Sequence, residues 1–518
     1  MHSDQKQEHI VANKRLQDLA WEPGFAELGN EYGSPQPPTA IDSPYLVAFN
    51  PNAAALLNLD PGEAARPEFA ETFSGNSLPN GATPFSQLYA GHQFGVWAGQ
   101  LGDGRAISLG QLRNAAGAVW DVQLKGSGKT PYSRFADGRA VLRSTIREYL
   151  GSAAMVGLGI PTTRALCIVG SDAPVYRETV ETSAILTRLA PSHVRFGNFE
   201  MFFYSRQFEL LGPLADHVIN AHFPQLKVHT PGPERYRAWM AEVIQSTAEL
   251  IADWQAVGFC HGVMNTDNMS VLGLTLDYGP FGFLDHFDPG WVCNHSDTAG
   301  RYAYNQQPEA ALWNLGRFAQ AILPLLSDEP DEAVSIAQSL LGDFRDQFDA
   351  AYLTRMASKL GLADRGTDGL ADAGPQDKAL LDELLKIMAR DEADFTRSFR
   401  ALCHVSAVNE SRDAVFQDEF KDRAAASAWL AQWRTRVAAQ GLSENGEHQA
   451  RMLAANPKYI LRNYLAQAAI ERAQAGDYAE IERLQELLSK PYNEQPGYED
   501  YARLPPASAA LISISCSS

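Results

Sequence analysis

Between residues 106 and 189 the pattern of apolar and polar residues predicts short strands around a single helix, with Val122 and Leu124 alternating with polar residues in one of the strands. The strands are expected at residues 106 to 112, 120 to 125, 164 to 169, 175 to 181 and 183 to 189. The helix is expected at residues 138 to 156, where the apolar side chains fall on one side. Strands on both sides of a lone helix predict a small antiparallel sheet with the helix docked on it.

The period becomes helical after about residue 206. A long amphipathic helix is expected at residues 233 to 257, followed by short strands at residues 269 to 276 and 281 to 285. Further helices are expected at residues 309 to 326, 331 to 341, 344 to 360, 376 to 390, 424 to 439, 459 to 475 and 479 to 489. The first eighty residues are rich in proline, which predicts a loop-rich extension wrapped on a later domain.

A length of 518 residues predicts two or three packed units. No run of 18 apolar residues occurs, so no membrane span is expected, and residues 1 to 15 are polar and carry no apolar signal core.

The net charge of −19 argues against a general nucleic-acid surface. The segment from Arg113 to Arg206 departs from this, with twelve basic and seven acidic residues. Either a phosphate-bearing ligand or a solvated helix face explains that excess.

The five cysteines are too few and too scattered for a disulfide framework or a zinc knuckle. We therefore expect a reducing, cytoplasmic location. Cys516 is third from the end in a small, polar tail, where a thiol is open to oxidation, although a bystander cysteine explains it as well.

The segment 261 to 268 (HGVMNTDN), followed by Asp277-Tyr278-Gly279, is similar to the catalytic loop and metal-binding Asp-Phe-Gly of protein kinases. His261 and Asn268 keep the kinase spacing, but Val263 stands where the kinase base would be. Asp267 is then the carboxylate left to act as base. Asn268 and Asp277 supply oxygen ligands that suit magnesium. An ordinary turn is the alternative for Asp-Tyr-Gly taken alone.

Other kinase parts have candidates upstream. Gly102 and Gly104 belong to a Gly-rich segment whose backbone can approach phosphate, although a plain turn is an equally simple explanation. Lys125 ends a predicted strand, and Glu148 lies in the predicted helix, an arrangement that suits an ion pair aiming the ammonium at phosphate. A second metal site at residues 285 to 288 with His295 is conceivable, but turn and packing roles are favoured there.

Five segments together resemble the selenoprotein O family, over roughly residues 80 to 465. They are residues 89 to 95 (YAGHQFG), 101 to 106 (LGDGRA), 124 to 128 (LKGSG), 261 to 268 (HGVMNTDN) and 456 to 459 (NPKY). The resemblance implies an α+β, protein-kinase-like bilobal fold. Its parts would be an N-terminal extension at residues 1 to 80, a small β-rich N-lobe at 81 to 205, a helical C-lobe at 206 to 345 and a helical C-terminal region at 346 to 518.

The resemblance also implies a function. Members of the family transfer AMP from ATP to hydroxyl side chains of proteins, with ATP flipped relative to kinases. Asp267 would then be the base, Asn268 and Asp277 would hold Mg²⁺ or Mn²⁺, and Glu148 would pair with Lys125. The residues expected to contact ATP are Gly102, Gly104, Arg105, Lys125, Asp137, Gly138, Arg188 and Arg195.

Cysteine at position 516, where eukaryotic members carry selenocysteine, implies a bacterial member. Bacterial relatives imply a disulfide from Cys516 to Cys293. Three alternatives to AMP transfer from ATP stay open at this point: phosphoryl transfer by a true kinase, UMP transfer from UTP, and a nucleotide-binding scaffold without catalysis. The protein substrates, the acceptor residue and the oligomeric state do not follow from the sequence.

Overall fold

The computed structural model describes residues 13 to 362, 374 to 441 and 446 to 514. The chain divides into two compact units. The first, here called the sheet unit, comprises Met1–Leu88, Leu101–Thr145 and Thr163–His193. The second, here called the helical unit, comprises Tyr89–Gln100, Ile146–Thr162 and Val194–Ser518. The fold class is therefore mixed, with a large antiparallel sheet and many helices, as predicted at the level of α+β.

The sheet unit is built on a nine-stranded sheet in which every strand pair is antiparallel. Its main path runs β2-β4-β7-β8-β11-β10-β3, with β1 paired to β7 and β9 to β11. The strands are β1 (Trp21–Glu22), β2 (Gly33–Pro35), β3 (Tyr45–Phe49), β4 (Phe85–Gln87), β7 (Ala106–Arg113), β8 (Val119–Lys125), β9 (Ala140–Val141), β10 (Arg164–Tyr176) and β11 (Val180–Ala190). The unit also contains α1 (Pro51–Leu56) and α2 (Pro67–Phe73).

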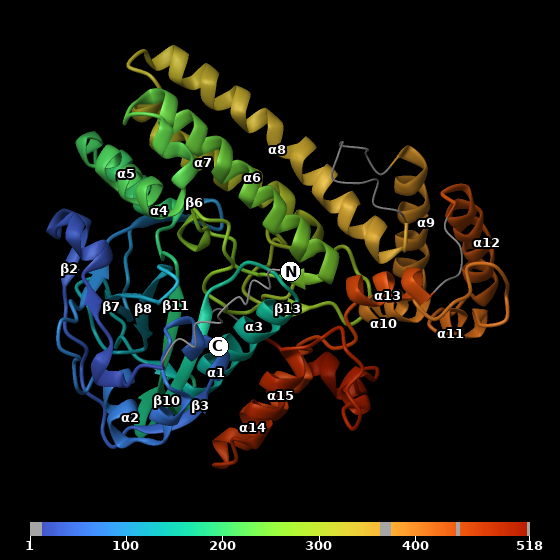
Figure 1. Cartoon of the computed structure of the whole chain (residues 1–518), viewed down its shortest axis with the longest axis horizontal. Helices are drawn as coiled ribbons and strands as arrows, with labels where there is room; N and C mark the ends of the chain where they lie inside the picture. The colour runs from blue at the N-terminus through green and yellow to red at the C-terminus, as the bar shows by residue number, and fades with distance from the viewer. Residues whose placement is uncertain (1–12, 363–373, 442–445, 515–518) are drawn as a thin grey trace, which may run out of the picture. The chain divides into compact units, whose positions relative to one another are not determined.

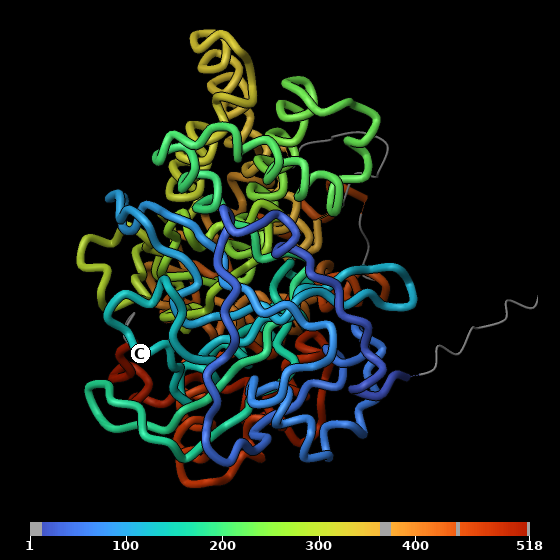
Figure 2. Tube along the Cα trace, turned by 90° about the vertical axis from the view of Figure 1, so that its left-hand side faces the viewer, coloured from blue at the N-terminus to red at the C-terminus, as the bar shows by residue number. Residues whose placement is uncertain are grey.

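Three strands of this sheet come from the first eighty residues, which the sequence predicted to be loop-rich. The first eighty residues are drawn in blue in Figures 1 and 2. The apolar core joins both parts, because Phe69 and Phe73 of α2 pack in one cluster with Leu124 and Ile185 from the sheet. These strands have only two to five residues, too short for an alternating pattern to be seen in the sequence.

The predicted strand at residues 175 to 181 is wrong. The structure ends β10 at Tyr176 and begins β11 at Val180, so the chain turns within that range. Val175 pairs with Glu181 across the hairpin. The turn residues 177 to 179 (RET) include no Gly, Pro, Asn or Asp, so no turn signal marked the end of the strand.

The helical unit contains most of the remaining elements. Its helices are α4 (Phe196–Tyr204), α5 (Leu211–His222), α6 (Pro233–Val257), α7 (Gln307–Leu326), α8 (Pro330–Lys359), α9 (Pro375–Asp391), α10 (Phe395–Leu402), α11 (Asp413–Gln417), α12 (Arg423–Ala439), α13 (Gly446–Ala455), α14 (Asn463–Gln474) and α15 (Ala479–Leu488). Two short hairpins, β5 (Ala90–Gln93) with β6 (Val96–Gln100) and β12 (Phe259–Cys260) with β13 (Gly282–Phe283), belong to it as well. Helix α3 (Leu142–Gly157) starts in the sheet unit and continues into the helical unit.

Helices α6, α7 and α8 pack against one another along their lengths and run side by side in Figure 1. Helix α6 has the predicted bounds and ends at Gly258, whose φ of 72° is the left-handed conformation common after a helix. The two helices predicted at residues 331 to 341 and 344 to 360 are one helix, α8. A single glycine inside a helix costs about 1 kcal/mol relative to alanine, which packing against α6 offsets at Gly342.

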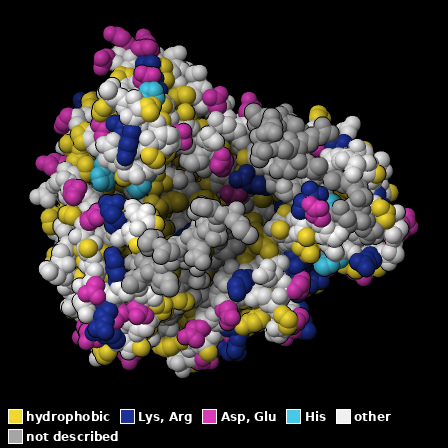
Figure 3. Space-filling view, in the orientation of Figure 1, with side chains coloured by type: hydrophobic (Ala, Val, Ile, Leu, Met, Phe, Trp, Pro, Cys, Tyr) yellow, Lys and Arg dark blue, Asp and Glu magenta, His cyan; other side chains and the backbone are white. Residues whose placement is uncertain are grey.

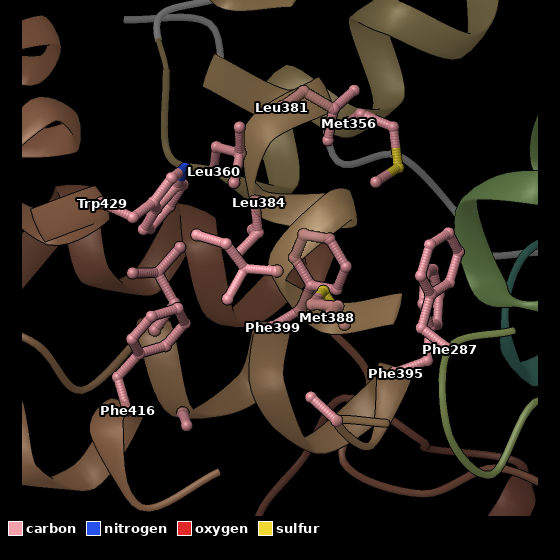
Figure 4. Packing of buried hydrophobic residues seen from close by; sticks show 14 of the residues in the cluster. Phe287, Met356, Leu360, Leu381, Leu384, Met388, Phe395, Phe399, Phe416 and Trp429 are labelled. Atoms are coloured by element: carbon pink, nitrogen blue, oxygen red, sulfur yellow. The ribbon is translucent and has the colours of Figure 1, made fainter. Parts of the chain in front are cut away.

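A second apolar core lies in the C-terminal part of the helical unit (Figure 4). Phe395 and Phe399 of α10 pack with Leu384 and Met388 of α9 and with Trp429 of α12. Burial of such side chains contributes about 1.5 to 3 kcal/mol each. This core contains Phe287 and Cys293 of the segment after Asp-Tyr-Gly, so it anchors the chain that leaves the catalytic loop.

Charged side chains of both signs lie on the surface of the protein. Figure 3 shows acidic and basic side chains interspersed over the described residues of one face. Among the described residues, no helix combines the length and apolar character that a membrane crossing requires.

Candidate functional site

The predicted catalytic loop follows β12 in the helical unit, and buried amide side chains hold its backbone. Asn294 donates from Nδ2 to Gly262 O at 2.9 Å, and Asn314 donates to Met264 O at 2.8 Å. Gln307 Oε1 accepts the backbone N–H of His261 at 2.9 Å. Buried amides that satisfy backbone groups fix a loop as firmly as secondary structure does.

His261 positions the loop, because both of its ring nitrogens form hydrogen bonds to the backbone. Its Nε2 donates to Leu276 O at 2.8 Å, directly before Asp277, and its ring stacks on Trp254 with centroids 5.2 Å apart. Burial lowers the pKa of His261 below its usual value. The neutral ring therefore joins the loop to the Asp-Tyr-Gly segment.

Asp267 lies on a short 3-10 turn (Thr266–Asn268) and is buried, with 8% of its surface exposed. Its Oδ2 accepts a hydrogen bond from Gln93 Nε2 at 3.1 Å, whereas Oδ1 has no partner among the described residues. Burial raises the pKa of the Asp267 carboxyl to about 6, and the hydrogen bond from Gln93 and the charge of Arg195 oppose that rise. A buried carboxylate with one unpartnered oxygen and a pKa near neutrality suits a general base.

Arg195 brings Asp267 and Asp277 together. Its Nη1 donates to Asp267 O at 2.8 Å and to Asp277 Oδ2 at 2.7 Å, and its guanidinium lies over the Tyr89 ring, 4.7 Å from the centroid. Asp277 has a φ of 50°, a left-handed conformation that costs a non-glycine residue about 1 to 3 kcal/mol. Such strain persists only where contacts such as this ion pair hold it.

Two of the described residues, Asn268 and Asp277, offer oxygen atoms that suit part of the ligand set of a hard divalent cation. Asn268 donates from Nδ2 to Val263 O at 3.0 Å, which leaves its amide oxygen as the ligand atom, and Asp277 carries a carboxylate. No group of three or more His, Cys, Asp or Glu side chains able to hold a metal occurs in the described ranges. The donor set of one amide and one carboxylate therefore suits a cation whose other ligands are phosphates and water, as is usual for Mg²⁺.

The alternative metal site after Asp-Tyr-Gly has a structural explanation. Asp285 is bound by Arg462 Nη1 at 2.8 Å, and the same arginine binds Asp394 at 2.8 Å. Arg462 is buried to 99%. The segment 285 to 288 therefore packs through an ion pair, as the favoured prediction had it.

The structure reveals a network around Thr266 to which the sequence assigned no role. Thr266 Oγ1 accepts the backbone N–H of His92 at 2.7 Å and donates to Glu200 Oε2, and His92 Nδ1 lies 2.6 Å from Glu200 Oε1. Asn265 Oδ1 accepts from the backbone N–H of Phe94 at 3.1 Å. Strand β5 is thus bonded to the catalytic loop. Residues 89 to 95 had been singled out only by family resemblance, because nothing in one sequence couples positions about 170 residues apart.

The Gly-rich segment of the sheet unit is tightly packed. A Cβ at Gly102, whose φ is 130°, would lie 2.5 Å from the Tyr132 ring, and one at Gly104 would lie 2.9 Å from Tyr132 O. Asp103 is buried between them, and its Oδ2 accepts the backbone N–H of Gln87 at 3.1 Å. Glycine is therefore required here by the neighbouring chain as well as by any ligand.

The other residues predicted to contact ATP lie on adjacent elements of the sheet unit. Lys125 ends β8 and pairs in register with Leu186, and Arg188 of β11 donates to Gln123 Oε1 at 3.2 Å. Asp137 binds Arg177 through both oxygens, at 2.7 and 2.9 Å, and this hydrogen bonding lowers the pKa of the carboxyl. Glu148 is buried in α3, and its pairing with Lys125 stays a prediction.

The chain is similar to known proteins over most of its length. Residues 15 to 489 match the family model described as protein adenylyltransferase SelO. The chain belongs to the SelO family. It is 52% identical to the protein nucleotidyltransferase YdiU of Thiobacillus denitrificans, over 97% of this chain and 99% of that protein. Its identity to proteins of the same name is 52% for Thioalkalivibrio sulfidiphilus (97% and 100% covered) and 51% for Paraburkholderia xenovorans (96% and 95% covered).

Membership of the SelO family confirms the resemblance inferred from the five segments, and the chain is thus a member of a nucleotidyltransferase family. All five segments fall within the matched residues.

Replacement of Gly91 by alanine is expected to lower kcat of the SelO-family protein about a hundredfold without unfolding it. A Cβ at position 91 would lie 2.9 Å from Asp267 Oδ1 and 3.1 Å from Thr266 Oγ1, so the Asp267 carboxylate would move. The matched control is Gly316→Ala on α7, where a Cβ meets nothing within 4 Å. Steady-state kinetics and thermal unfolding of both variants check this, and equal activity of the two would refute it.

Proposed function

We propose that this protein transfers AMP from ATP to Ser, Thr or Tyr hydroxyls of other proteins and releases pyrophosphate, on a protein-kinase-like bilobal fold. The observation that supports this most strongly is the state of Asp267. It is a buried carboxylate with one unpartnered oxygen and a pKa raised to about 6, in a loop where Val263 leaves the kinase base position without an acceptor. The base has been relocated within the loop, which fits a reaction at a different phosphorus atom.

The proposed step is a displacement at the α-phosphorus. The acceptor hydroxyl gives its proton to the Asp267 carboxylate as its oxygen forms a bond to the α-phosphorus, and the bond from that phosphorus to pyrophosphate breaks. Gln93 donates a hydrogen bond to Asp267 Oδ2, which holds the carboxylate in one orientation. Arg195 fixes the backbone of Asp267 relative to Asp277 through two hydrogen bonds from one nitrogen.

Asn268 and Asp277 would hold the divalent cation, Mg²⁺ or Mn²⁺. When bound, such a cation supplies positive charge that screens the phosphates of the nucleotide. The Arg195 ion pair orients the Asp277 carboxylate and leaves its position fixed before any ligand arrives.

Nucleotide binding is assigned to the basic segment of the chain. Gly102 and Gly104 give backbone amides access to phosphate, and Lys125, Arg105 and Arg188 provide positive charge in a protein of net charge −19. Asp137 and Gly138 would contact ATP from the turn before β9, and Glu148 would orient Lys125. This assignment explains the local basic excess better than a solvated face does, because Arg188 is buried.

The proposal is tested by release of pyrophosphate from ATP in the presence and absence of acceptor protein, with UTP in parallel. Acceptor-dependent release from ATP at saturating Mg²⁺ is expected. Release from UTP at equal efficiency would instead favour UMP transfer. No release, with nucleotide still bound, would favour a scaffold.

We also propose that the C-terminal thiol bonds to Cys293, although Cys516 lies outside the described residues. The backbone N–H of His295 donates to Ile514 O at 2.8 Å, so the described end of the tail lies beside the segment that carries Cys293. The four described cysteines (Cys167, Cys260, Cys293 and Cys403) form no disulfide with one another. Mass mapping under non-reducing conditions is expected to find Cys293 joined to Cys516. If Cys516 is always free, or is joined to another cysteine, the proposal is wrong.

A further inference from the structure

The β5-β6 hairpin of the helical unit presents an exposed aromatic surface beside Asp267. Phe94 and Trp97 are each 37% exposed and Val96 is 70% exposed. Trp97 packs on Tyr204 of α4, with ring centroids 4.1 Å apart, and Phe208 just beyond α4 is 43% exposed. We call these five residues the aromatic surface. Large apolar side chains gathered at the surface mark an interaction site more often than scattered ones do.

The same hairpin has an open strand edge. Among the described residues β6 pairs with β5 alone, so its second edge has no strand partner. An unpaired edge offers a row of N–H and C=O groups to any extended segment, and proteins commonly cover or charge such edges. Here four of the five residues of β6 are exposed and none carries a charge.

Two arginines beneath the hairpin have no carboxylate partner in the described ranges. Arg301 lies over the Trp313 ring at 4.6 Å, and Arg317 lies over the same ring at 5.2 Å. The turn of the hairpin rests on the first of them, because a Cβ at Gly95 would be 2.9 Å from Arg301 Cζ. Arg301 hydrogen-bonds Tyr302 and Arg317 hydrogen-bonds Tyr204, so neither positive charge is neutralised by these neighbours. Two such charges in a protein of net charge −19 favour a partner that carries acidic side chains.

The hairpin is continuous with the reaction site. Gln93, the last residue of β5, binds Asp267, and the N–H groups of His92 and Phe94 bind the catalytic loop. A strand bound to the outer edge of β6 would lie about two strand spacings, roughly 10 Å, from β5. Three residues of extended chain span that distance.

We propose that β6 and the aromatic surface bind an extended segment of the protein substrate, with apolar side chains at alternate positions and an acidic residue near Arg301. The acceptor hydroxyl would lie about three to five residues from the apolar positions. This inference rests on the proposed function and adds to it the class of segment that the enzyme selects.

The test uses the full chain, ATP labelled at the α-phosphate, and a degenerate peptide library with one fixed Ser, Thr or Tyr. Selection of apolar residues at alternate positions and of Asp or Glu is expected. Methylation of backbone nitrogens at alternate positions of a selected peptide is expected to lower kcat/KM about tenfold, because it blocks strand pairing.

Three variants test which residues of the hairpin and of its surroundings bind the substrate segment. Trp97→Ala and Val96→Lys are expected to raise KM for a selected peptide about tenfold and to leave KM for ATP unchanged. Arg301→Gln is expected to weaken only peptides that contain the acidic residue. Val334→Lys on α8, an exposed valine away from the hairpin in sequence, is the matched control and is expected to change neither constant.

Other outcomes overturn the proposal. Transfer to peptides without positional preference, or equal KM values in all variants, would remove the docking role while the transfer activity stands. Failure of the parent protein to label any peptide would contradict the proposed function and the docking inference together. If Trp97→Ala turns a dimer into a monomer in light scattering, the surface is an interface between copies and the docking inference is wrong.

Discussion

Asp267→Asn is expected to lower kcat/KM for AMP transfer by about a hundred- to ten-thousand-fold, the usual contribution of a general base. Asparagine keeps the shape of the side chain and still accepts the hydrogen bond from Gln93, but it takes no proton. In the parent protein kcat/KM should rise with pH through about 6, because the base must be ionised. In Asp267→Asn that inflection should be absent. A pH series of initial rates measures both.

The stability of the same variant is a second readout. Burial raises the pKa of Asp267 above its unfolded value, so the folded state holds the proton longer and the parent loses stability as pH rises from about 4 to about 6. Asp267→Asn lacks this loss and should unfold at a temperature no lower than the parent does at pH 8. The control is Asp288→Asn, whose side chain only closes a turn onto Gly290. Equal activity of Asp267→Asn and this control would contradict the role of the base.

Asp277→Ala is expected to lower labelling at least about a thousandfold, since a metal ion contributes several kcal/mol to charge stabilisation. The substitution removes the carboxylate that Arg195 orients at 2.7 Å, and with it the only charged ligand predicted for the cation. Binding of Mn²⁺ to the nucleotide complex, followed by electron paramagnetic resonance, should weaken in parallel with activity. Unchanged Mn²⁺ binding in the variant would show that the cation is held elsewhere.

The sequence predicted the long elements of the fold well because their periodic patterns are strong. Helix α6 has the predicted bounds, and β7 and β8 differ from prediction by one residue at one end. Elements set by distant partners could not be predicted. The strands before residue 50 form because β4, β7 and β10 lie beside them in space, and a sequence does not show that adjacency.

The residues of the candidate site also fall into two groups: those that a local motif predicts and those whose contribution depends on the fold. Asp267, Asn268 and Asp277 were predicted from a local motif, because spacing within one loop is visible in a sequence. Arg195 was predicted to contact nucleotide, and the structure places it between Asp267 and Asp277. The contribution of Gln93 and His92 depends on the approach of β5 to the loop, which only the fold determines. The pKa of Asp267 depends on burial and was likewise beyond reach of the motif.

The most direct test of the central claim is incubation of the protein with an acceptor protein and ATP labelled at either the α- or the γ-phosphate, followed by mass mapping of the modified site. The proposed reaction predicts label on the acceptor from the α-phosphate only, together with the mass of an AMP group on a Ser, Thr or Tyr residue. Label from the γ-phosphate, with the mass of a phosphoryl group, would contradict the account and identify the protein as a kinase.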